Sequence, residues 1–130
     1  MNVYDLKDSQ ITIKPSDSVR KLYLELTSEC NFDCEMCFRH SFLTSFGSMT
    51  DDSLARVLRE IRSLPRLEEV VLGGIGEPMM HPSFPQVVNE LKSMGLKISI
   101  TSNGALVAPH IDLLVENKVN ALYLSFETGA

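Results

Sequence analysis

The sequence lacks the features that a membrane, a nucleic acid or an export pathway would require. Its apolar runs are only a few residues long, whereas a membrane-spanning helix needs about 20 consecutive apolar residues. Its net charge is −5, so no basic surplus exists to neutralise a phosphate backbone. The first ten residues, MNVYDLKDSQ, have neither the basic region nor the apolar region of a secretory signal. We therefore expect a cytoplasmic protein with no membrane partner and no nucleic-acid partner.

Repeats and low-complexity tracts are absent as well. Hydrophobic residues make up 44% of the chain and charged residues 22%, which is typical of a soluble globular protein. At 130 residues the chain is one domain at most, or a piece of a larger one.

Cysteine is scarce, and the few cysteines present are close together. All three, Cys30, Cys34 and Cys37, lie within eight positions of the sequence CNFDCEMC. An odd number of cysteines without an export signal argues against a disulfide framework and for reduced thiols. Three soft thiolates with the spacing C-x₃-C-x₂-C suit either zinc or an iron–sulfur cluster.

These two metal sites differ in how they use a fourth ligand. A structural zinc site needs four protein ligands, and His40 would complete a Cys₃His site in a binding module without catalysis. A [4Fe–4S] cluster bound by three cysteines leaves one iron without a protein ligand, and such an open position is what a catalytic site requires. The spacing favours the cluster and leaves zinc as the alternative.

After residue 20 the sequence alternates between strand patterns and helix patterns. Lys21–Thr27 has period-two alternation, and the runs EVVLGG, KISIT and ALYLSF are further β-rich segments. Apolar residues at helical spacing precede Pro65, recur from Phe84 to Met94, and recur again from Pro109 to Asn117. The resulting order, β-α-β-α-β-α-β, predicts an α/β fold with parallel strands and right-handed helical crossovers.

Local signals predict the ends and the buried faces of these helices. Thr50 is a suitable N-cap for the first helix, and Gly95 is a suitable C′ residue for the second. In the third helix we expect Ile111, Leu114 and Val115 to face inward.

The two ends of the chain do not complete this pattern. We interpret residues 1–20 as a lead-in with a short accessory strand at QITIK, and residues 21–130 as one α/β unit. The sequence stops just after the fourth strand, whereas a (β/α)₈ barrel takes about 250 residues. Either the sheet stays open, as in a small doubly wound fold, or residues 21–130 are the first part of a barrel of which the rest is missing, and we favour the second interpretation.

Four polar or glycine-rich segments follow the four predicted strands. They are the cysteine loop (Cys30–Ser48), GGIGEP (Gly73–Pro78), TSNG (Thr101–Gly104) and SFET (Ser125–Thr128). Because the carboxyl ends of parallel strands form the ligand face of such folds, we expect these segments to meet there.

The types of residue in these segments suggest ligand contacts, although each segment is also compatible with an ordinary turn. The three glycines of GGIGEP would leave backbone accessible to a ligand, and Glu77 would direct a carboxylate at a cationic group. The glycine spacing is not that of a nucleotide phosphate loop. Ser102 and Asn103 have groups that hydrogen-bond a sugar or a carboxylate, and we give Ser125 and Glu127 the same interpretation.

Taken together, these four segments resemble the radical S-adenosylmethionine (SAM) superfamily. Cys30, Cys34 and Cys37 match its C-x₃-C-x₂-C motif, GGIGEP is similar to its GGEP motif, and TSNG is similar to its TNG segment. The resemblance extends from about Leu22 to the end of the chain. It implies a partial, TIM-like (β/α)₆ barrel, of which about four strands are present.

The resemblance also implies cofactors and residue roles. The three cysteines would ligate a [4Fe–4S] cluster, and the open iron would be chelated by the amino and carboxylate groups of SAM. An electron from a reductant such as flavodoxin or ferredoxin would cleave SAM, and the resulting 5′-deoxyadenosyl radical would abstract a hydrogen atom from the substrate. The implied SAM contacts are Gly73, Gly74, Gly76 and Glu77 at the methionyl ammonium, and Ser102, Asn103, Ser125 and Glu127 at the ribose or carboxylate.

Two positions depart from the family pattern. Met36 precedes the last cysteine where an aromatic residue is frequent, and Glu127 stands where aspartate is commoner. The lead-in and the GSMT segment resemble peptide- or protein-modifying maturases with a SPASM extension, including those that accompany tungsten-dependent oxidoreductases. This similarity implies a peptide, protein or cofactor-maturation substrate.

Overall fold

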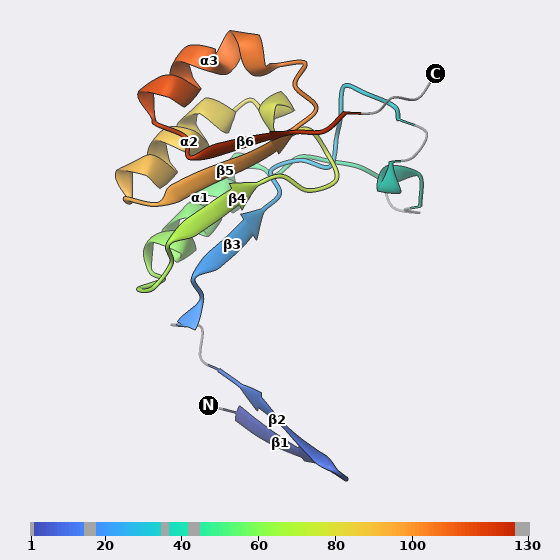
Figure 1. Cartoon of the computed structure of the whole chain (residues 1–130), viewed down its shortest axis with the longest axis vertical. Helices are drawn as coiled ribbons and strands as arrows, with labels where there is room; N and C mark the ends of the chain where they lie inside the picture. The colour runs from blue at the N-terminus through green and yellow to red at the C-terminus, as the bar shows by residue number, and fades with distance from the viewer. Residues whose placement is uncertain (1, 15–17, 35–36, 42–44, 127–130) are drawn as a thin grey trace.

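A parallel four-stranded sheet forms the centre of the computed structural model, which describes residues 2–14, 18–34, 37–41 and 45–126 (Figure 1). The sheet order is β3-β4-β5-β6, and every neighbouring pair is parallel. The strands are β3 (Lys21–Leu24), β4 (Glu69–Leu72), β5 (Lys97–Ser102) and β6 (Ala121–Leu124). The predicted alternation of strands and helices is confirmed, and within the described residues the sheet is open rather than a closed barrel.

Helices α1 (Asp51–Arg62), α2 (Phe84–Ser93) and α3 (Val107–Glu116) cover one face of this sheet (Figure 1). Thr50 caps α1 as predicted, since its side-chain oxygen accepts the backbone N–H of Ser53 at 3.2 Å. Gly95 follows α2 with a φ of 77°, which is the left-handed conformation expected of a C′ glycine.

The hydrophobic core lies between the sheet and the helices. In the central strands β4 and β5, the apolar residues that point to the helices are fully buried, because successive residues of a strand alternate between the two faces. Burial of each such side chain contributes about 1.5–3 kcal/mol. The opposite face is open at its edge strands, where Tyr23 is 73% exposed and Tyr123 is 61% exposed, whereas Val71 and Ser99 of the central strands are buried. The largest core side chains include Phe84, Leu91, Leu72, Ile98 and Ile100.

The inward face of α3 differs from the prediction at two of three positions. Leu114 is buried, but Ile111 is 47% exposed and Val115 is 67% exposed. The helix begins at Val107 rather than Pro109, and it packs on the core through a stripe displaced by one residue. The partly buried apolar residues of this stripe are Leu106, Val107 and Leu113.

The lead-in contains more structure than predicted. Strands β1 (Asn2–Leu6) and β2 (Ser9–Ile13) form an antiparallel hairpin that stands apart from the main sheet (Figure 1). The expected accessory strand corresponds to β2, whereas its partner β1 was not predicted. Every residue of both strands is exposed. No helix of the described residues has the length and apolarity needed to cross a membrane.

Candidate active site at the carboxyl ends of the strands

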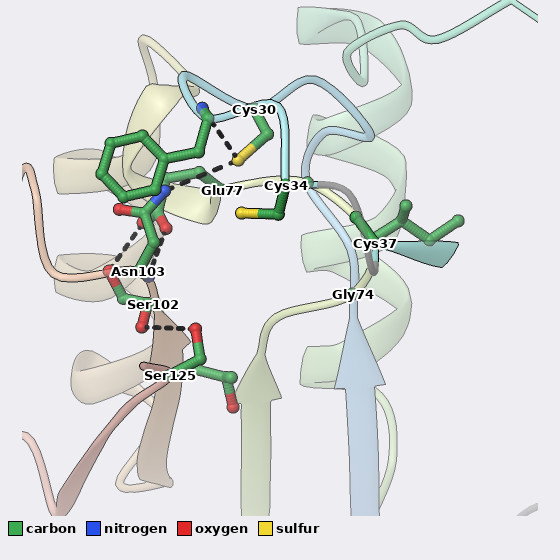
Figure 2. Close-up of a pocket in the computed structure, with 12 residues that line it drawn as sticks. Cys30, Cys34, Cys37, Gly74, Glu77, Ser102, Asn103 and Ser125 are labelled. Atoms are coloured by element: carbon green, nitrogen blue, oxygen red, sulfur yellow. Dashed lines mark hydrogen bonds between the residues drawn. The ribbon is translucent and has the colours of Figure 1, made fainter. Parts of the chain in front are cut away.

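A cavity of about 140 Å³ lies where the loops that follow the four strands meet (Figure 2). Its lining confirms that segments far apart in the sequence come together at this end of the sheet. Gly73 is buried at the end of β4 and does not line the cavity, and Glu127 lies outside the described residues. The lining consists of Cys30, Phe32, Cys34, Cys37, Gly74, Ile75, Gly76, Glu77, Thr101, Ser102, Asn103 and Ser125.

None of the three cysteines is in a disulfide, and each is partly buried at this cavity. Figure 2 shows the sulfur atoms of Cys30 and Cys34 on the side of the cavity where Asn103 lies. The backbone N–H of Cys37 donates to the carbonyl of Cys34 at 3.1 Å, so these two residues belong to one tight turn. Three soft sulfur donors on one loop at one cavity are a suitable ligand set for an iron–sulfur cluster.

His40 is engaged with the backbone of the cysteine loop. Its Nε2 lies 2.8 Å from the carbonyl oxygen of Cys34 and 3.4 Å from Oδ1 of Asp33. Within the described part of the chain, no group of three or more cysteine, histidine or acidic side chains is close enough to hold a metal ion. The metal-binding role of the three cysteines, with or without His40, stays a prediction.

The glycines of GGIGEP allow close approach to the segment that leads into the cysteine loop. Gly74 has a φ of 113°, and a Cβ at this position would lie 2.6 Å from the carboxyl group of Glu25. A Cβ at Gly76 would lie 2.3 Å from the carbonyl oxygen of Glu29 and 2.4 Å from that of Thr27. All three distances are far shorter than any normal contact, so these positions accept only glycine without displacement of their neighbours.

Two hydrogen bonds hold GGIGEP against the same segment. The backbone N–H of Ile75 donates to Oε1 of Glu25 at 2.6 Å, and the backbone N–H of Glu77 donates to the carbonyl of Glu29 at 2.8 Å. The role of Glu25 was not predicted from the sequence. Its position in the sequence could have indicated this role. Glu25 is a charged residue two positions after Tyr23, so its side chain is expected on the same open face of the sheet.

Glu77 is almost completely buried, with 2% of its surface exposed. Its carboxylate accepts the hydroxyl of Ser102 at 2.9 Å and the backbone N–H groups of Asn103 at 2.8 Å and Met79 at 3.3 Å. A carboxylate offers about four acceptor positions. Three of these are therefore used within the protein.

Asn103 connects the end of β5 with the cysteine loop. Its Nδ2 donates to Oδ1 of Asn31 at 2.8 Å and to Sγ of Cys30 at 3.5 Å, while its Oδ1 accepts the backbone N–H of Ala105 at 3.0 Å. Figure 2 shows this contact with Cys30 and the nearby contact with Glu77. The contribution of Asn31 was not predicted, because it depends on a residue 72 positions away.

Ser102 and Ser125 fix the ends of the two last strands to each other. Both the backbone N–H and the hydroxyl of Ser125 donate to the carbonyl of Ser102, at 2.9 Å and 3.3 Å. The hydroxyl oxygen of Ser102 also accepts the backbone N–H of Gly104 at 3.0 Å. Both serines line the cavity, and both hydroxyl groups already form hydrogen bonds within the protein, so their role as ligand contacts stays a prediction.

A second polar group lies at the opposite ends of the strands, on the open face of the sheet. The hydrogen bond from the hydroxyl of Ser99 to Glu69, 2.7 Å long, lowers the pKa of the Glu69 carboxyl, and nearby Lys21 acts in the same direction. The negative charge of Glu69 in turn raises the pKa of Lys21. These residues stabilise the sheet away from the cavity.

Sequence comparisons relate the chain to one protein family and to several longer proteins. The sequence profile described as "Radical SAM superfamily" matches residues 24–130. The tungsten-containing aldehyde ferredoxin oxidoreductase cofactor-modifying protein of Pyrococcus furiosus is 37% identical over 110 residues, which is 84% of this chain and 31% of that protein. A GTP 3′,8-cyclase of Synechocystis sp. is 34% identical over 113 residues, which is 85% of this chain and 34% of that enzyme. The chain thus spans about a third of the length of these relatives.

A comparison of folds gives a consistent result. The crystal structure of BtrN in complex with AdoMet and 2-DOIA superimposes with a TM-score of 0.74, covering 88% of this chain and 48% of BtrN. The sequence identity is 19%, so this likeness concerns the fold alone. The four-stranded parallel sheet of this chain corresponds to part of that fold.

Proposed function

The chain belongs to the radical SAM superfamily, and on that premise we propose that it is the cluster- and SAM-binding part of a radical SAM enzyme. Members of this family use a [4Fe–4S] cluster and SAM. The observation that carries the proposal is the single cavity that the three cysteines share with GGIGEP and with Ser102 and Asn103. We assign residues 21–130 to the radical SAM core and residues 1–20 to its lead-in.

Cys30, Cys34 and Cys37 hold the cluster in this proposal. The three sulfur donors fit it because none is in a disulfide, all belong to one loop and all line one cavity. The bound cluster supplies the electron for reductive cleavage of SAM. The protein's own contribution is to place the ligands and to limit the access of water to the cavity.

GGIGEP and the ends of β5 and β6 hold SAM. The remaining acceptor position of Glu77 suits the methionyl ammonium, because a hydrogen bond between a buried carboxylate and a cationic donor is stronger than one between neutral groups. Backbone carbonyl groups of Gly74 and Gly76, which line the cavity, would supply further acceptors, whereas Gly73 does not line it. The ribose or carboxylate of SAM is assigned to Ser102, Ser125 and Glu127, whereas the amide nitrogen of Asn103 already donates to Asn31 and Cys30.

In this proposal the reaction modifies its substrate as a step of cofactor, peptide or protein maturation. The name of the Pyrococcus furiosus relative, a cofactor-modifying protein, supports a cofactor, peptide or protein substrate. A flavodoxin or a ferredoxin is the proposed reductant. The hydrogen atom would be abstracted by the 5′-deoxyadenosyl radical, and no residue of this chain is assigned as a catalytic group.

Anaerobic reconstitution with iron and sulfide tests the proposal. We expect a brown protein with broad absorption near ~400 nm, which single Cys30→Ala, Cys34→Ala and Cys37→Ala variants lose. A Ser93→Ala variant on the exposed side of α2 serves as a control and should retain the absorption. Stoichiometric zinc that survives oxygen and is lost in His40→Ala would instead support the Cys₃His binding module.

A further inference from the structure

The contact between Asn103 and Cys30 assigns a role to Asn103 that differs from ligand binding. We infer that Asn103 is a positioning residue whose amide group donates a hydrogen bond to the sulfur of Cys30 and thereby raises the reduction potential of the bound cluster. The inference rests on the proposed function, because it requires Cys30 to be a cluster ligand.

The orientation of the Asn103 amide is determined by its surroundings. The backbone N–H of Ala105 points at Oδ1 at 3.0 Å, and a backbone N–H group can only donate. This contact identifies the other terminal atom as the nitrogen. That nitrogen, Nδ2, lies 3.5 Å from Sγ of Cys30 and 2.8 Å from Oδ1 of Asn31. Asn103 therefore presents a donor, and not an acceptor, to the sulfur atom.

The hydrogen-bonding capacity of Asn103 is almost completely used within the protein. The amide nitrogen has two N–H groups, and its two acceptors are Asn31 and Cys30. A carboxylate of SAM could be bound by this nitrogen only if one of those contacts were given up. The inferred role leaves both contacts in place.

The buried carboxylate of Glu77 holds Asn103 where this contact can form. Oε2 of Glu77 accepts the backbone N–H of Asn103 at 2.8 Å, and Oε1 accepts the hydroxyl of the preceding Ser102 at 2.9 Å. Two successive residues at the end of β5 are thus fixed to one buried group. Because the amide is anchored from its backbone and from its Oδ1, its nitrogen has little freedom to leave Cys30.

The sign of the effect follows from electrostatics. The reduced cluster carries one more negative charge than the oxidised cluster, and part of that charge resides on the cysteine sulfur atoms. An N–H donor interacts more favourably with the more negative acceptor, so it stabilises the reduced form. Hydrogen bonds to the sulfur atoms are among the factors that set cluster potentials. Removal of the donor should therefore make the potential more negative.

The test measures the potential of the reconstituted cluster in the wild-type chain and in Asn103→Ala. We expect the variant to retain its iron. Its reduction potential should be about 59 mV more negative than that of the wild type, which corresponds to an equilibrium constant about tenfold less favourable to reduction for a one-electron couple. SAM affinity should change by less than about twofold. Asn117→Ala is the matched control, since its amide donates to Asn89 and Leu113 near the end of α3, and its potential should equal that of wild type.

Two further variants protect the test against a failure of Asn103→Ala to take up iron. Asn103→Asp removes the donor while its size is kept, and Asn103→Gln keeps the donor on a longer side chain. The potential of the aspartate variant should be more negative than that of the glutamine variant.

An unchanged potential in an iron-loaded Asn103→Ala or Asn103→Asp protein would overturn the inference. So would a loss of SAM affinity of tenfold or more without a shift of potential. Loss of iron from all three variants would overturn it too, since Asn103 would then hold the loop rather than tune the sulfur. If the wild-type chain itself takes up no cluster, the proposed function fails, and that outcome is distinguished by the iron content of the wild type.

Discussion

The two loops that contribute most of the cavity lie at the same end of the sheet but are stabilised differently. GGIGEP is held by buried backbone contacts: Gly76 lies against two carbonyl groups, and Glu77 is 2% exposed. In the cysteine loop, Asn31 and Asp33 are exposed, and the contacts of His40 and Asn103 with this loop are polar ones near the surface. We therefore expect substitutions in GGIGEP to act on the fold, and substitutions in the cysteine loop to act on what the cavity binds.

Gly76→Ala should have the largest effect on stability. The added methyl group would meet the carbonyl oxygens of Glu29 and Thr27 at 2.3 Å and 2.4 Å, and neither is the end of a flexible side chain. We expect a loss of about 3 kcal/mol or more in the free energy of unfolding, measured by urea denaturation. Gly47→Ala is the matched control, because a Cβ at that position would have no neighbouring atom within 4 Å. Equal stabilities of the two variants would contradict the close packing at Gly76.

Glu77→Gln should have the next largest effect on stability. The amide nitrogen of glutamine cannot accept a hydrogen bond, so at least one of the three donors that face Glu77 loses its partner. An unsatisfied buried group costs about 1–3 kcal/mol. Glu116→Gln on the exposed side of α3 is the control. SAM affinity should also fall in Glu77→Gln at constant iron content, and full SAM affinity would exclude Glu77 as the site of the ammonium.

Cys34→Ser extends the comparison to the other loop. The side chain is only partly buried, so the free energy of unfolding of the metal-free chain should change by less than about 0.5 kcal/mol. The iron content after reconstitution should nevertheless fall well below that of wild type. A stability loss as large as that of Glu77→Gln would show that the cysteine loop supports the fold as strongly as GGIGEP does.

Ser99→Ala should have the smallest effect, and it lies far from both loops. The pKa of Glu69 is lowered in the folded state, so Glu69 contributes stability above its unfolded pKa, and this contribution is lost as the pH falls through its folded pKa. Removal of the Ser99 hydroxyl should raise the folded pKa toward its usual value and reduce the loss of stability on acidification. NMR titration of Glu69 in both proteins measures the shift, and identical titration curves would refute the assigned cause.

The sequence predicts those features of the fold that depend on local periodicity. The four strands and the caps at Thr50 and Gly95 follow from alternation, helical spacing and capping chemistry, and so does the common location of the four loops. The inward face of α3 was assigned wrongly, because apolar residues surround much of that helix and only tertiary packing selects the buried stripe. Strand β1 was missed because its pairing with β2, and not its own composition, makes it a strand.

The site was predicted at the level of its residue types but not of its internal contacts. The sequence places cysteines, glycines and Glu77 at one edge of the sheet. It gives no indication that Glu77 serves Asn103, or that Glu25 accepts a hydrogen bond from a backbone group 50 residues away. Such contacts depend on the register and twist of neighbouring parallel strands, which local patterns do not encode.

The most direct test of the account is the electron paramagnetic resonance spectrum of the reduced, reconstituted chain with and without SAM. The central claim is that Cys30, Cys34 and Cys37 leave one iron open for SAM at the cavity. The account predicts that SAM changes the spectrum of the wild-type cluster and that this change is weaker in Glu77→Gln. An iron-loaded protein whose spectrum is the same with and without saturating SAM would contradict it.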